Sequence, residues 1–333
     1  PLLVSARIPA GTAPEALATG TAARIFTGAN VPAGADAVVM QEQARLDGDM
    51  VRFESPVQAG QNIRPQGQDL TRGTLALAHG SRLRPQELGL LASLGLATVP
   101  VQRRLRVAVF ATGDELVEPG QPLRPGQIYN TNRFTLQALL TGMNCDVITC
   151  DTLGDTLAAT VDALRDVAGR ADLIITSGGV SVGEEDHVRA AMNELGKLSL
   201  WRLAIKPGKP LAFGHIGSTP VIGLPGNPAA VFVTFLMIAA PFIRQTRGQP
   251  ITTPAGLPLP AAFEVARPSI RREFMRARKE QHEGQWQVAV YPNQSSGVLS
   301  SACWADGLAV VPEHSCVSRG DPVVFYSFDE LMG

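Results

Sequence analysis

The pattern of apolar and polar positions is clearest between Arg104 and residue 253, where short apolar runs alternate with amphipathic segments. The runs are bounded by polar or turn residues and predict strands at 105–111, 146–150, 172–176 and 221–224. Apolar residues at helical spacing predict helices at 132–141, 156–168, 185–195 and 229–243, with Thr131 or Asn132 capping the first. Alternating strands and helices favour a doubly wound, mostly parallel sheet. We therefore expect a multi-domain α/β protein with this sheet domain at its centre, flanked by small β-rich domains.

The two ends of the chain have a different pattern, with short apolar runs between Gly and Pro turns. This pattern is typical of β-rich domains, which we expect at 1–65 and, in a β-barrel-like form, at 254–333. Residues 66–103 include a run at helical spacing and precede the central domain at 104–253. We expect this run to be the helical segment of a linking or dimerisation domain.

The longest apolar run, Ala229 to Ile243, is interrupted by Thr234 and Pro241 and is shorter than the roughly 20 residues of a membrane span. It predicts a buried helix, and no membrane partner is expected. The four cysteines form no C-x-x-C pair, which favours reduced thiols and a cytoplasmic protein.

Composition and charge narrow the class of protein further. With 333 residues and 45% hydrophobic content, the chain can form several packed domains, and wholesale disorder is not expected. Lys and Arg number 29 against 30 Asp and Glu, so the basic excess typical of a nucleic-acid binder is missing. Only 5% of the residues are aromatic, which leaves few side chains on which bases could stack. No nucleic-acid partner is therefore expected.

Glycines and carboxylates gather where the predicted strands end, in the loops 111–116, 151–155, 177–186 and 223–228. Ligands of parallel sheets bind outside these carboxyl ends. The glycines of 177–186 let backbone N–H groups approach an anion, and the next helix offers its N-terminus. A tight turn is the alternative for the glycines alone, but their place beside the other loops favours a ligand site.

Four acids at these strand ends, Asp114, Glu115, Asp155 and Asp186, would repel a phosphate unless a cation lay between them. Mg²⁺ bound by carboxylates and phosphate oxygens resolves the conflict. Each acid also has a plainer alternative: a turn for Asp114, a solvated charge for Glu115, a helix N-cap for Asp155 and the helix dipole for Asp186.

Basic residues are concentrated around a Pro-Gly turn that is flanked by Lys206 and Lys209. These two lysines could clamp an anionic ligand, and a solvated hairpin turn is the alternative. In the loop 225–228, the two prolines add rigidity and Asn227 could bind the ligand or only cap the apolar helix. The residues alone thus predict an α/β protein with a cation-assisted site for a phosphate-bearing ligand.

Several motifs together resemble the molybdopterin molybdenumtransferase family, which includes the E domain of gephyrin. They are Thr112–Leu116, Ile128–Asn132, Thr176–Gly183, Lys206–Pro210 and Leu224–Pro228, with further similarity at 24–29, 32–38, 64–69 and 272–278. The resemblance implies the last step of molybdenum cofactor synthesis, in which adenylylated molybdopterin and molybdate give the cofactor and AMP with Mg²⁺. It also implies an elongated homodimer, with molybdopterin adenylyltransferase and molybdoenzymes as possible partners.

The resemblance assigns roles to individual residues. The catalytic residues and cation ligands implied are Glu115, Asp155 and Asp186. The residues implied to bind substrate from the central domain are Thr112, Gly113, Asp114, Ser177, Gly178, Gly179, Ser181, Gly183, Lys206, Lys209, Pro225, Asn227 and Pro228. Thr27 and Asp69 match positions that face the partner subunit's cleft, and Arg278 and Ser296 match contacts to molybdate or cofactor from the last domain.

The sequence departs from the family at two places. A segment resembling Asn-Ser-Ala-Met-Asp-Gly-Tyr-Ala is expected before the first residue and is absent, which bears on activity and dimerisation. Arg202 stands where many relatives have Lys. Two other functions stay open: a molybdopterin adenylyltransferase, which lacks the flanking β domains, and a gephyrin-like scaffold without enzymatic activity.

Overall fold

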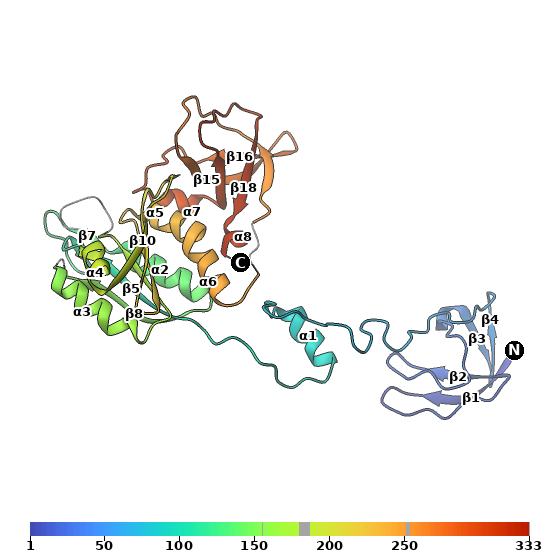
Figure 1. Cartoon of the computed structure of the whole chain (residues 1–333). Helices are drawn as coiled ribbons and strands as arrows, with labels where there is room; N and C mark the ends of the chain where they lie inside the picture. Colours follow the sequence, from blue (N-terminus) through green and yellow to red (C-terminus); the bar gives the residue numbers. More distant parts are fainter. Residues whose placement is uncertain (155, 180–186, 251–253, 333) are drawn as a thin grey trace. The chain divides into compact units, whose positions relative to one another are not determined.

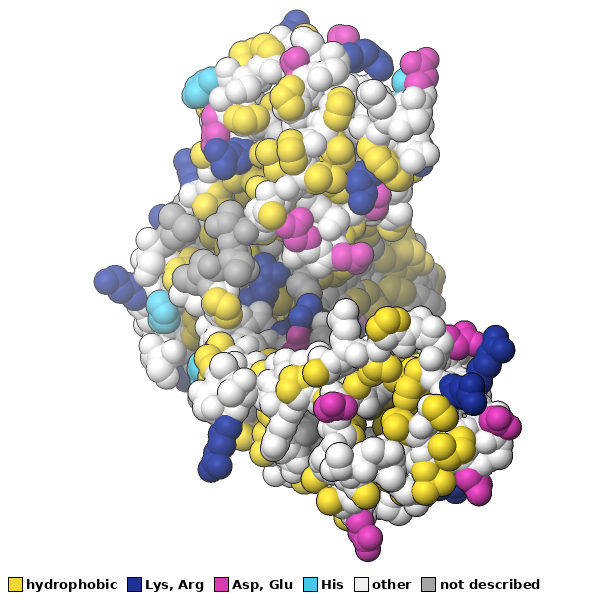
Figure 2. Space-filling model, turned by 90° about the vertical axis from the view of Figure 1, so that its right-hand side faces the viewer, with side chains coloured by type: hydrophobic (Ala, Val, Ile, Leu, Met, Phe, Trp, Pro, Cys, Tyr) yellow, Lys and Arg dark blue, Asp and Glu magenta, His cyan; other side chains and the backbone are white. Residues whose placement is uncertain are grey.

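A computed structural model of the chain describes residues 1–154, 156–179, 187–250 and 254–332. The chain forms two compact units, Pro1–Ala78 and His79–Gly333, and each is described here by itself (Figure 1). On the face of the molecule drawn in Figure 2, positively and negatively charged side chains are interspersed, in keeping with 29 basic and 30 acidic residues.

The N-terminal unit is built on a four-stranded sheet in the order β2-β1-β4-β3. Its elements are β1 (Leu2–Ile8), β2 (Thr21–Ile25), the 3₁₀ turn η1 (Gln41–Gln43), β3 (Ala44–Asp47) and β4 (Met50–Phe53). Along β1, partly buried residues alternate with exposed ones, because successive side chains of a strand point to opposite faces.

The central part of the second unit is a six-stranded sheet in the order β10-β12-β13-β9-β5-β8. Its strands are β5 (Arg106–Thr112), β8 (Asp146–Leu153), β9 (Leu173–Ser177), β10 (Gly196–Arg202), β12 (Pro210–Ile216) and β13 (Thr219–Leu224). The pairs β5–β8, β5–β9 and β9–β13 are parallel, whereas β12 is antiparallel to both of its neighbours. The predicted mostly parallel sheet is therefore confirmed.

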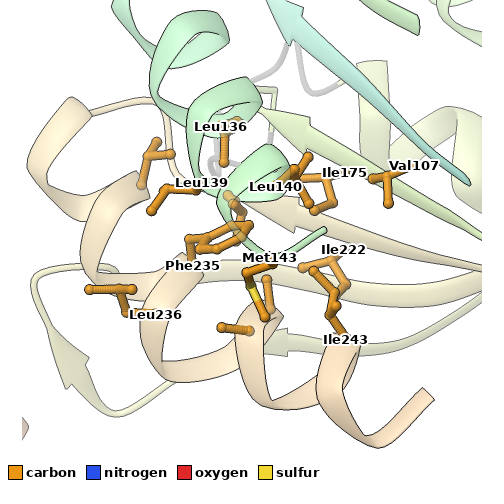
Figure 3. Close-up of a cluster of buried hydrophobic side chains, with 14 of the residues drawn as sticks. Val107, Leu136, Leu139, Leu140, Met143, Ile175, Ile222, Phe235, Leu236 and Ile243 are labelled. Carbon is orange, nitrogen blue, oxygen red and sulfur yellow. The ribbon is translucent and has the colours of Figure 1, made fainter. Parts of the chain in front are cut away.

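Helices cover both faces of this sheet: α2 (Thr131–Gly142), α3 (Leu157–Ala168), α4 (His187–Leu195), α5 (Pro228–Thr234), the π-helical turn η2 (Phe235–Ala239) and α6 (Ala240–Thr246). One core packs Val107, Ile175 and Ile222 of the sheet against α2 and the α5–α6 helix (Figure 3). A second core packs the alternate residues Ala108 and Ile174 against α3 and α4. The period of two along each strand thus supplies both hydrophobic layers.

The predicted buried helix is the continuous stretch Pro228–Thr246, which includes η2. Among the described residues it is the one helix long and apolar enough to cross a membrane by length and composition. Phe235, Leu236 and Ile243 are fully buried in the first core, so the apolar character of the helix is explained by packing inside the protein (Figure 3).

The C-terminal part is a second six-stranded sheet, in the order β11-β15-β17-β18-β14, with β16 paired to β15. Its elements are β11 (Ile205–Lys206), β14 (Leu257–Pro260), β15 (Arg272–His282), β16 (Gln285–Val290), α7 (Ser300–Trp304), β17 (Gly307–Val311), β18 (Pro322–Ser327) and α8 (Phe328–Met332). β11 lies between β10 and β12 in sequence, so a segment of the central domain supplies an edge strand of the C-terminal sheet.

Three short elements complete the unit: α1 (Pro85–Ser93) and the paired strands β6 (Leu116–Val117) and β7 (Ile128–Tyr129). The helix predicted between 66 and 103 is α1, and Pro85 occupies its first turn. None of its residues is buried.

The cap predicted for α2 is wrong, and so is the N-cap role that was the alternative for Asp155. The residue that caps α2 is Asn130, whose side chain accepts a hydrogen bond from the backbone N–H of Arg133 at 3.1 Å. Thr131 and Asn132 already lie inside this helix. Thr156 caps α3 and accepts from the N–H of Ala159 at 3.3 Å, so the N-cap role considered for Asp155 belongs to the next residue.

Candidate functional site

A cleft of about 890 Å³ opens at the carboxyl ends of β5, β9 and β13. This is the edge of the sheet at which the sequence predicts a ligand. The C-terminal domain contributes to the cleft wall as well. The lining residues are Thr112, Gly113, Glu115 and Leu116, Ile128–Asn132, Ser177–Gly179, Lys206–Pro210, Pro225–Pro228 with Ala230, Arg271, and Gln294–Ser296.

The turn at the end of β9 is built from Gly178 and Gly179, which have φ angles of +87° and +62°. A Cβ on Gly178 would lie 2.8 Å from the carbonyl oxygen of Thr112, and one on Gly179 would lie 2.8 Å from Cγ2 of Val188. Glycine is therefore needed here for both conformation and space. The N–H of Gly178 donates to the carbonyl of Leu224 at 3.2 Å, which joins the ends of β9 and β13.

Asn132 connects three segments at the cleft, although its own side chain was predicted only as a possible helix cap. Its Nδ2 donates to Oγ of Ser177 at 2.8 Å and to the carbonyl of Gly226 at 2.7 Å. A carbonyl can only accept, so this contact fixes which way the amide points. Asn132 is 9% exposed, and its two hydrogen bonds hold α2, β9 and the 225–228 loop together. The Ile128–Asn132 motif was the signal that could have identified this role.

Asn227 stands at the N-cap position of α5, but its side chain makes no capping hydrogen bond. The capping alternative is therefore wrong. Its Nδ2 donates instead to Oγ of Ser296 at 3.0 Å, and the N–H of Ala229 donates to the carbonyl of Ser296 at 2.9 Å. These bonds bring the predicted Ser296 into the cleft, where the predicted Pro225 and Pro228 also lie.

The two predicted lysines both line the cleft but differ in their surroundings. Nζ of Lys206 forms an ion pair with Oε1 of Glu273 at 3.0 Å, whereas Lys209 is exposed. The turn between them is not a solvated hairpin, because β11 pairs in parallel with β15 and Gly208 is buried. Gly208 has a φ of +108°, and a Cβ there would overlap the methyl group of Thr234.

Two arginines that the sequence reasoning missed lie at or behind the cleft wall. Arg271 lines the cleft, and its Nη1 donates to the carbonyl of Ile205 at 3.4 Å. Arg276 is 1% exposed and donates to Oγ of Ser301 at 2.8 Å and to the carbonyl of Ser295 at 3.0 Å. Burial lowers the pKa of Arg276 to about 10, so its guanidinium is still charged at neutral pH. It supports the 294–296 loop from inside the C-terminal domain.

Arg278, the arginine predicted at this site, does not line the cleft. Its guanidinium lies over the ring of Trp304, 4.4 Å from the centroid, and 3.7 Å from the carboxylate of Glu280. Arg278 lies within β15, whereas Arg271, which does line the cleft, directly precedes that strand.

Of the predicted acids, Glu115 lines the cleft and Asp114 is exposed in the preceding turn. The carboxylate of Glu115 folds over Gly113, where a Cβ would overlap it. Asp155, Asp186, Ser181 and Gly183 lie outside the described residues. Within the ranges that the structure describes, no group of three or more His, Cys, Asp or Glu could hold a metal ion.

Thr27 and Asp69 lie in the N-terminal unit, both in exposed turns or bends. Thr112 and Ser177, for which a role in binding substrate was predicted, line the cleft. Most of the predicted binding residues in the described central domain are thus brought together at one edge of its sheet.

Comparisons with known proteins agree with this architecture. Three family models match in order: the MoeA N-terminal region (domain I and II) at residues 3–95, a probable molybdopterin binding domain at 108–245, and the MoeA C-terminal region (domain IV) at 258–328. The chain is 41% identical to a molybdopterin molybdenumtransferase of Haemophilus influenzae, over 94% of this chain and 78% of that protein. It is 37% identical to molybdopterin molybdenumtransferase 2 of Mycobacterium tuberculosis, with the same coverage.

A crystal structure of a molybdopterin biosynthesis moeA protein from Pyrococcus horikoshii matches with a TM-score of 0.83 and 28% identity. The match covers 98% of this chain and 81% of that one. On these grounds the chain belongs to the molybdopterin molybdenumtransferase family.

Proposed function

We propose that this protein is a molybdopterin molybdenumtransferase that takes adenylylated molybdopterin and molybdate and releases molybdenum cofactor and AMP. The observation that carries the proposal is the charge of the cleft wall. Among the described lining residues, Lys206, Lys209 and Arg271 are basic and Glu115 is the one acid. This wall suits a ligand that carries several negative charges.

The pyrophosphate of the substrate fits best between the Gly178–Gly179 turn and Lys209. The turn cannot carry side chains, so a phosphate oxygen can approach its backbone closely. Lys209 is exposed and can follow the ligand as a mobile point charge. Thr112 and Gly113 continue this wall at the end of β5. Asp114, Ser181 and Gly183 are proposed to bind the same phosphates, as the family resemblance implies.

Molybdate fits the side of the cleft that the C-terminal domain forms. Oγ of Ser296 is held by Asn227, and Arg271 lies on the same side. Arg276 adds a buried positive charge behind Ser295. Hydroxyl and guanidinium donors match the oxygens of a tetrahedral oxyanion, so we assign molybdate to this side.

A divalent cation such as Mg²⁺ suits the carboxylate side of the cleft. Glu115 supplies a hard oxygen ligand there, and Asp155 and Asp186 are proposed to complete the set. When bound, Mg²⁺ would neutralise and polarise the pyrophosphate oxygens. The bond that breaks is the phosphoanhydride of the adenylate, with the new oxygen of AMP coming from molybdate or water, while molybdenum is taken up by the dithiolene sulfurs.

In this reaction the protein's own residues bind the two substrates and orient them towards each other. The lysines and the glycine turn hold the phosphates, and Ser296 and Arg271 hold the incoming oxyanion close to them. Stabilisation of charge that develops on the phosphate oxygens is the main contribution that we assign to the site.

We place the reaction in a cytoplasmic homodimer. In such a dimer, Thr27 and Asp69 of one subunit would face the cleft of its partner, as the family resemblance implies. Molybdopterin adenylyltransferase would supply the adenylylated substrate, and molybdoenzymes would take up the product.

The function is tested by incubating the protein with adenylylated molybdopterin, Mg²⁺ and molybdate and measuring AMP. Release of AMP that depends on molybdate supports the transferase. Formation of the adenylate from ATP would instead support an adenylyltransferase. Absence of either reaction, with tight binding of a receptor peptide, would support a scaffold.

A further inference from the structure

Glu273 stands directly behind the basic wall of the cleft, and neither the fold nor the proposed reaction requires an acid there. It is cross-strand partner to Lys206 in the β11–β15 pair, with Nζ to Oε1 at 3.0 Å. Glu273 is 8% exposed, so its charge is poorly screened by solvent. A nearly buried carboxylate therefore lies behind the wall, next to a group that should attract anions.

Several contacts hold the lysine strand in place without this ion pair. The N–H of Arg272 donates to the carbonyl of Ala204 at 3.0 Å, and Nη1 of Arg271 donates to that of Ile205 at 3.4 Å. The buried Gly208 packs closely against Thr234 after the strand. A neutral acceptor in place of Glu273 could also keep the hydrogen bond to Lys206. The charge of Glu273 is thus the property that the rest of the structure does not already supply.

We propose that Glu273 is an affinity-setting residue: its negative charge offsets that of Lys206 and weakens the binding of oxyanions in the cleft. This inference rests on the proposed function, because that function supplies the anionic ligand. Its physical basis is Coulomb's law, in which the repulsion between Glu273 and a ligand grows in proportion to the ligand's charge. A cleft that bound its anionic ligands too tightly in the ground state would gain no rate from that binding, so a counter-charge of this kind is useful.

The proportionality gives a signature that a purely structural role would not produce. Molybdate and perrhenate are tetrahedral oxyanions of similar size, with two negative charges and one. Removing the charge of Glu273 should therefore stabilise bound molybdate about twice as much, in free energy, as bound perrhenate. Expressed as dissociation constants, the gain for molybdate should be about the square of the gain for perrhenate.

The test measures binding of each anion to the full chain by calorimetry at neutral pH, for wild type and Glu273→Gln. Gln keeps the acceptor that Lys206 needs and removes only the charge. We expect the Kd of molybdate to fall about tenfold and that of perrhenate about threefold, a ratio set by the ligand charges. The matched control is Glu313→Gln. Glu313 forms an ion pair of 3.1 Å with Arg272, which is the neighbour of Glu273 on β15. Glu313 does not line the cleft. Both anions should bind this variant as they bind wild type.

Four outcomes would overturn the inference. Wild type and Glu273→Gln could bind the anions with equal affinity, or the variant could gain equally for both anions. The variant could also bind more weakly than wild type, or neither protein could show measurable anion binding. AMP release by the same preparations keeps this result apart from the proposed function. A wild-type protein that releases AMP in a molybdate-dependent way, with an unchanged Kd in Glu273→Gln, retains the function and loses only the role of Glu273. A protein whose gain in affinity is larger for molybdate than for perrhenate, as described above, but which releases no AMP, retains the role of Glu273 in anion binding and loses the reaction.

Discussion

Asn227 of the central domain and Ser296 of the C-terminal domain are joined by a hydrogen bond of 3.0 Å from Nδ2 to Oγ. Asn227 directly precedes the helix that forms much of the first core, whereas Ser296 belongs to a loop supported by the buried Arg276. The bond therefore fixes a cleft residue of one domain against a cleft residue of the other. Although Asn227 stands at an N-cap position, its side chain makes this contact between domains and no capping hydrogen bond.

Asn227→Ala and Ser296→Ala should each raise the KM for molybdate by about tenfold, because the first change releases the hydroxyl of Ser296 from its position and the second removes it. The free energy of unfolding should fall by no more than about 1 kcal/mol, since the bond is neutral and exposed. The double variant should be no worse than either single one. Molybdate titrations of AMP release and urea unfolding measure both quantities, and additive effects on KM would show that the two side chains act separately.

The free energy of unfolding should fall more when Asn132 is replaced by a charged residue than when its side chain is truncated. Asn132→Ala removes two hydrogen bonds at a buried site and should cost about 2 kcal/mol of stability. Asn132→Asp keeps the shape but turns a carboxylate oxygen towards the carbonyl of Gly226, so it should cost more than the alanine variant. Urea unfolding of both proteins measures the difference. An aspartate variant as stable as wild type would contradict the assigned contact.

Gly178→Ala should destabilise the protein by about 1–3 kcal/mol and lower turnover strongly, because it combines a φ of +87° with a close approach to Thr112. Gly226→Ala is the matched comparison for stability. Gly226 lies in the same cleft, but the nearest atom to its added Cβ is Cα of Gly178 at 3.7 Å, an ordinary contact. Thermal unfolding of the two variants should differ clearly, and equal losses would argue against the strained turn.

The stability of the central domain should depend on pH through Asp172 at the opposite edge of the sheet. Its carboxylate accepts from Arg103 at 2.5 and 2.7 Å and from the N–H of Arg106 at 2.8 Å, and these contacts hold the pKa of Asp172 well below its usual range. A carboxyl whose pKa is lowered on folding stabilises the protein above the pKa of the unfolded state, near 4, and loses this contribution as the pH falls below it.

Asp172→Asn should therefore cost about 2 kcal/mol at pH 7, and the difference from wild type should be smaller at pH 3. Urea unfolding at pH 7, 5 and 3 measures it. Asp162→Asn is a suitable control, because Asp162 pairs with Arg165 on an exposed helix face and should contribute little at any of these pH values. A difference for Asp172→Asn that stayed constant from pH 7 to pH 3 would contradict the lowered pKa.

The central domain could be predicted well from the sequence because its signals are local. Each parallel strand is a short apolar run, and residues such as Val107 and Ala108 face opposite cores, so the pattern and the packing agree. Glycine turns at strand ends indicated the edge of the sheet where the cleft lies. The antiparallel strand β12 and its neighbour β10 were missed, because Pro, Gly and charged residues interrupt their apolar pattern.

The parts of the site that depend on contacts between domains could not be predicted in this way. Nothing in the local pattern of 202–210 indicates that Lys206 pairs with Glu273, 67 positions further along the chain. The same limit applies to Arg278, since the sequence does not show that Arg271, just before β15, lines the cleft and Arg278 does not. Which residue caps a helix depends on the side-chain hydrogen bonds at its first turn. The capping residues, Asn130 and Thr156, are sequence neighbours of the residues considered for this role.

The central claim is that the basic cleft at the edge of the sheet is where molybdate drives release of AMP. The most direct test is the rate of AMP release at increasing molybdate for wild type, Lys209→Met and Lys197→Met. Lys197 is exposed on β10 and does not line the cleft. Lys197→Met therefore removes the same charge as Lys209→Met, but outside the site. We expect molybdate-dependent release by wild type and Lys197→Met, and at least a tenfold loss of kcat/KM in Lys209→Met, about 1.4 kcal/mol of transition-state stabilisation. AMP release that did not depend on molybdate, or an equal loss in both lysine variants, would contradict the account.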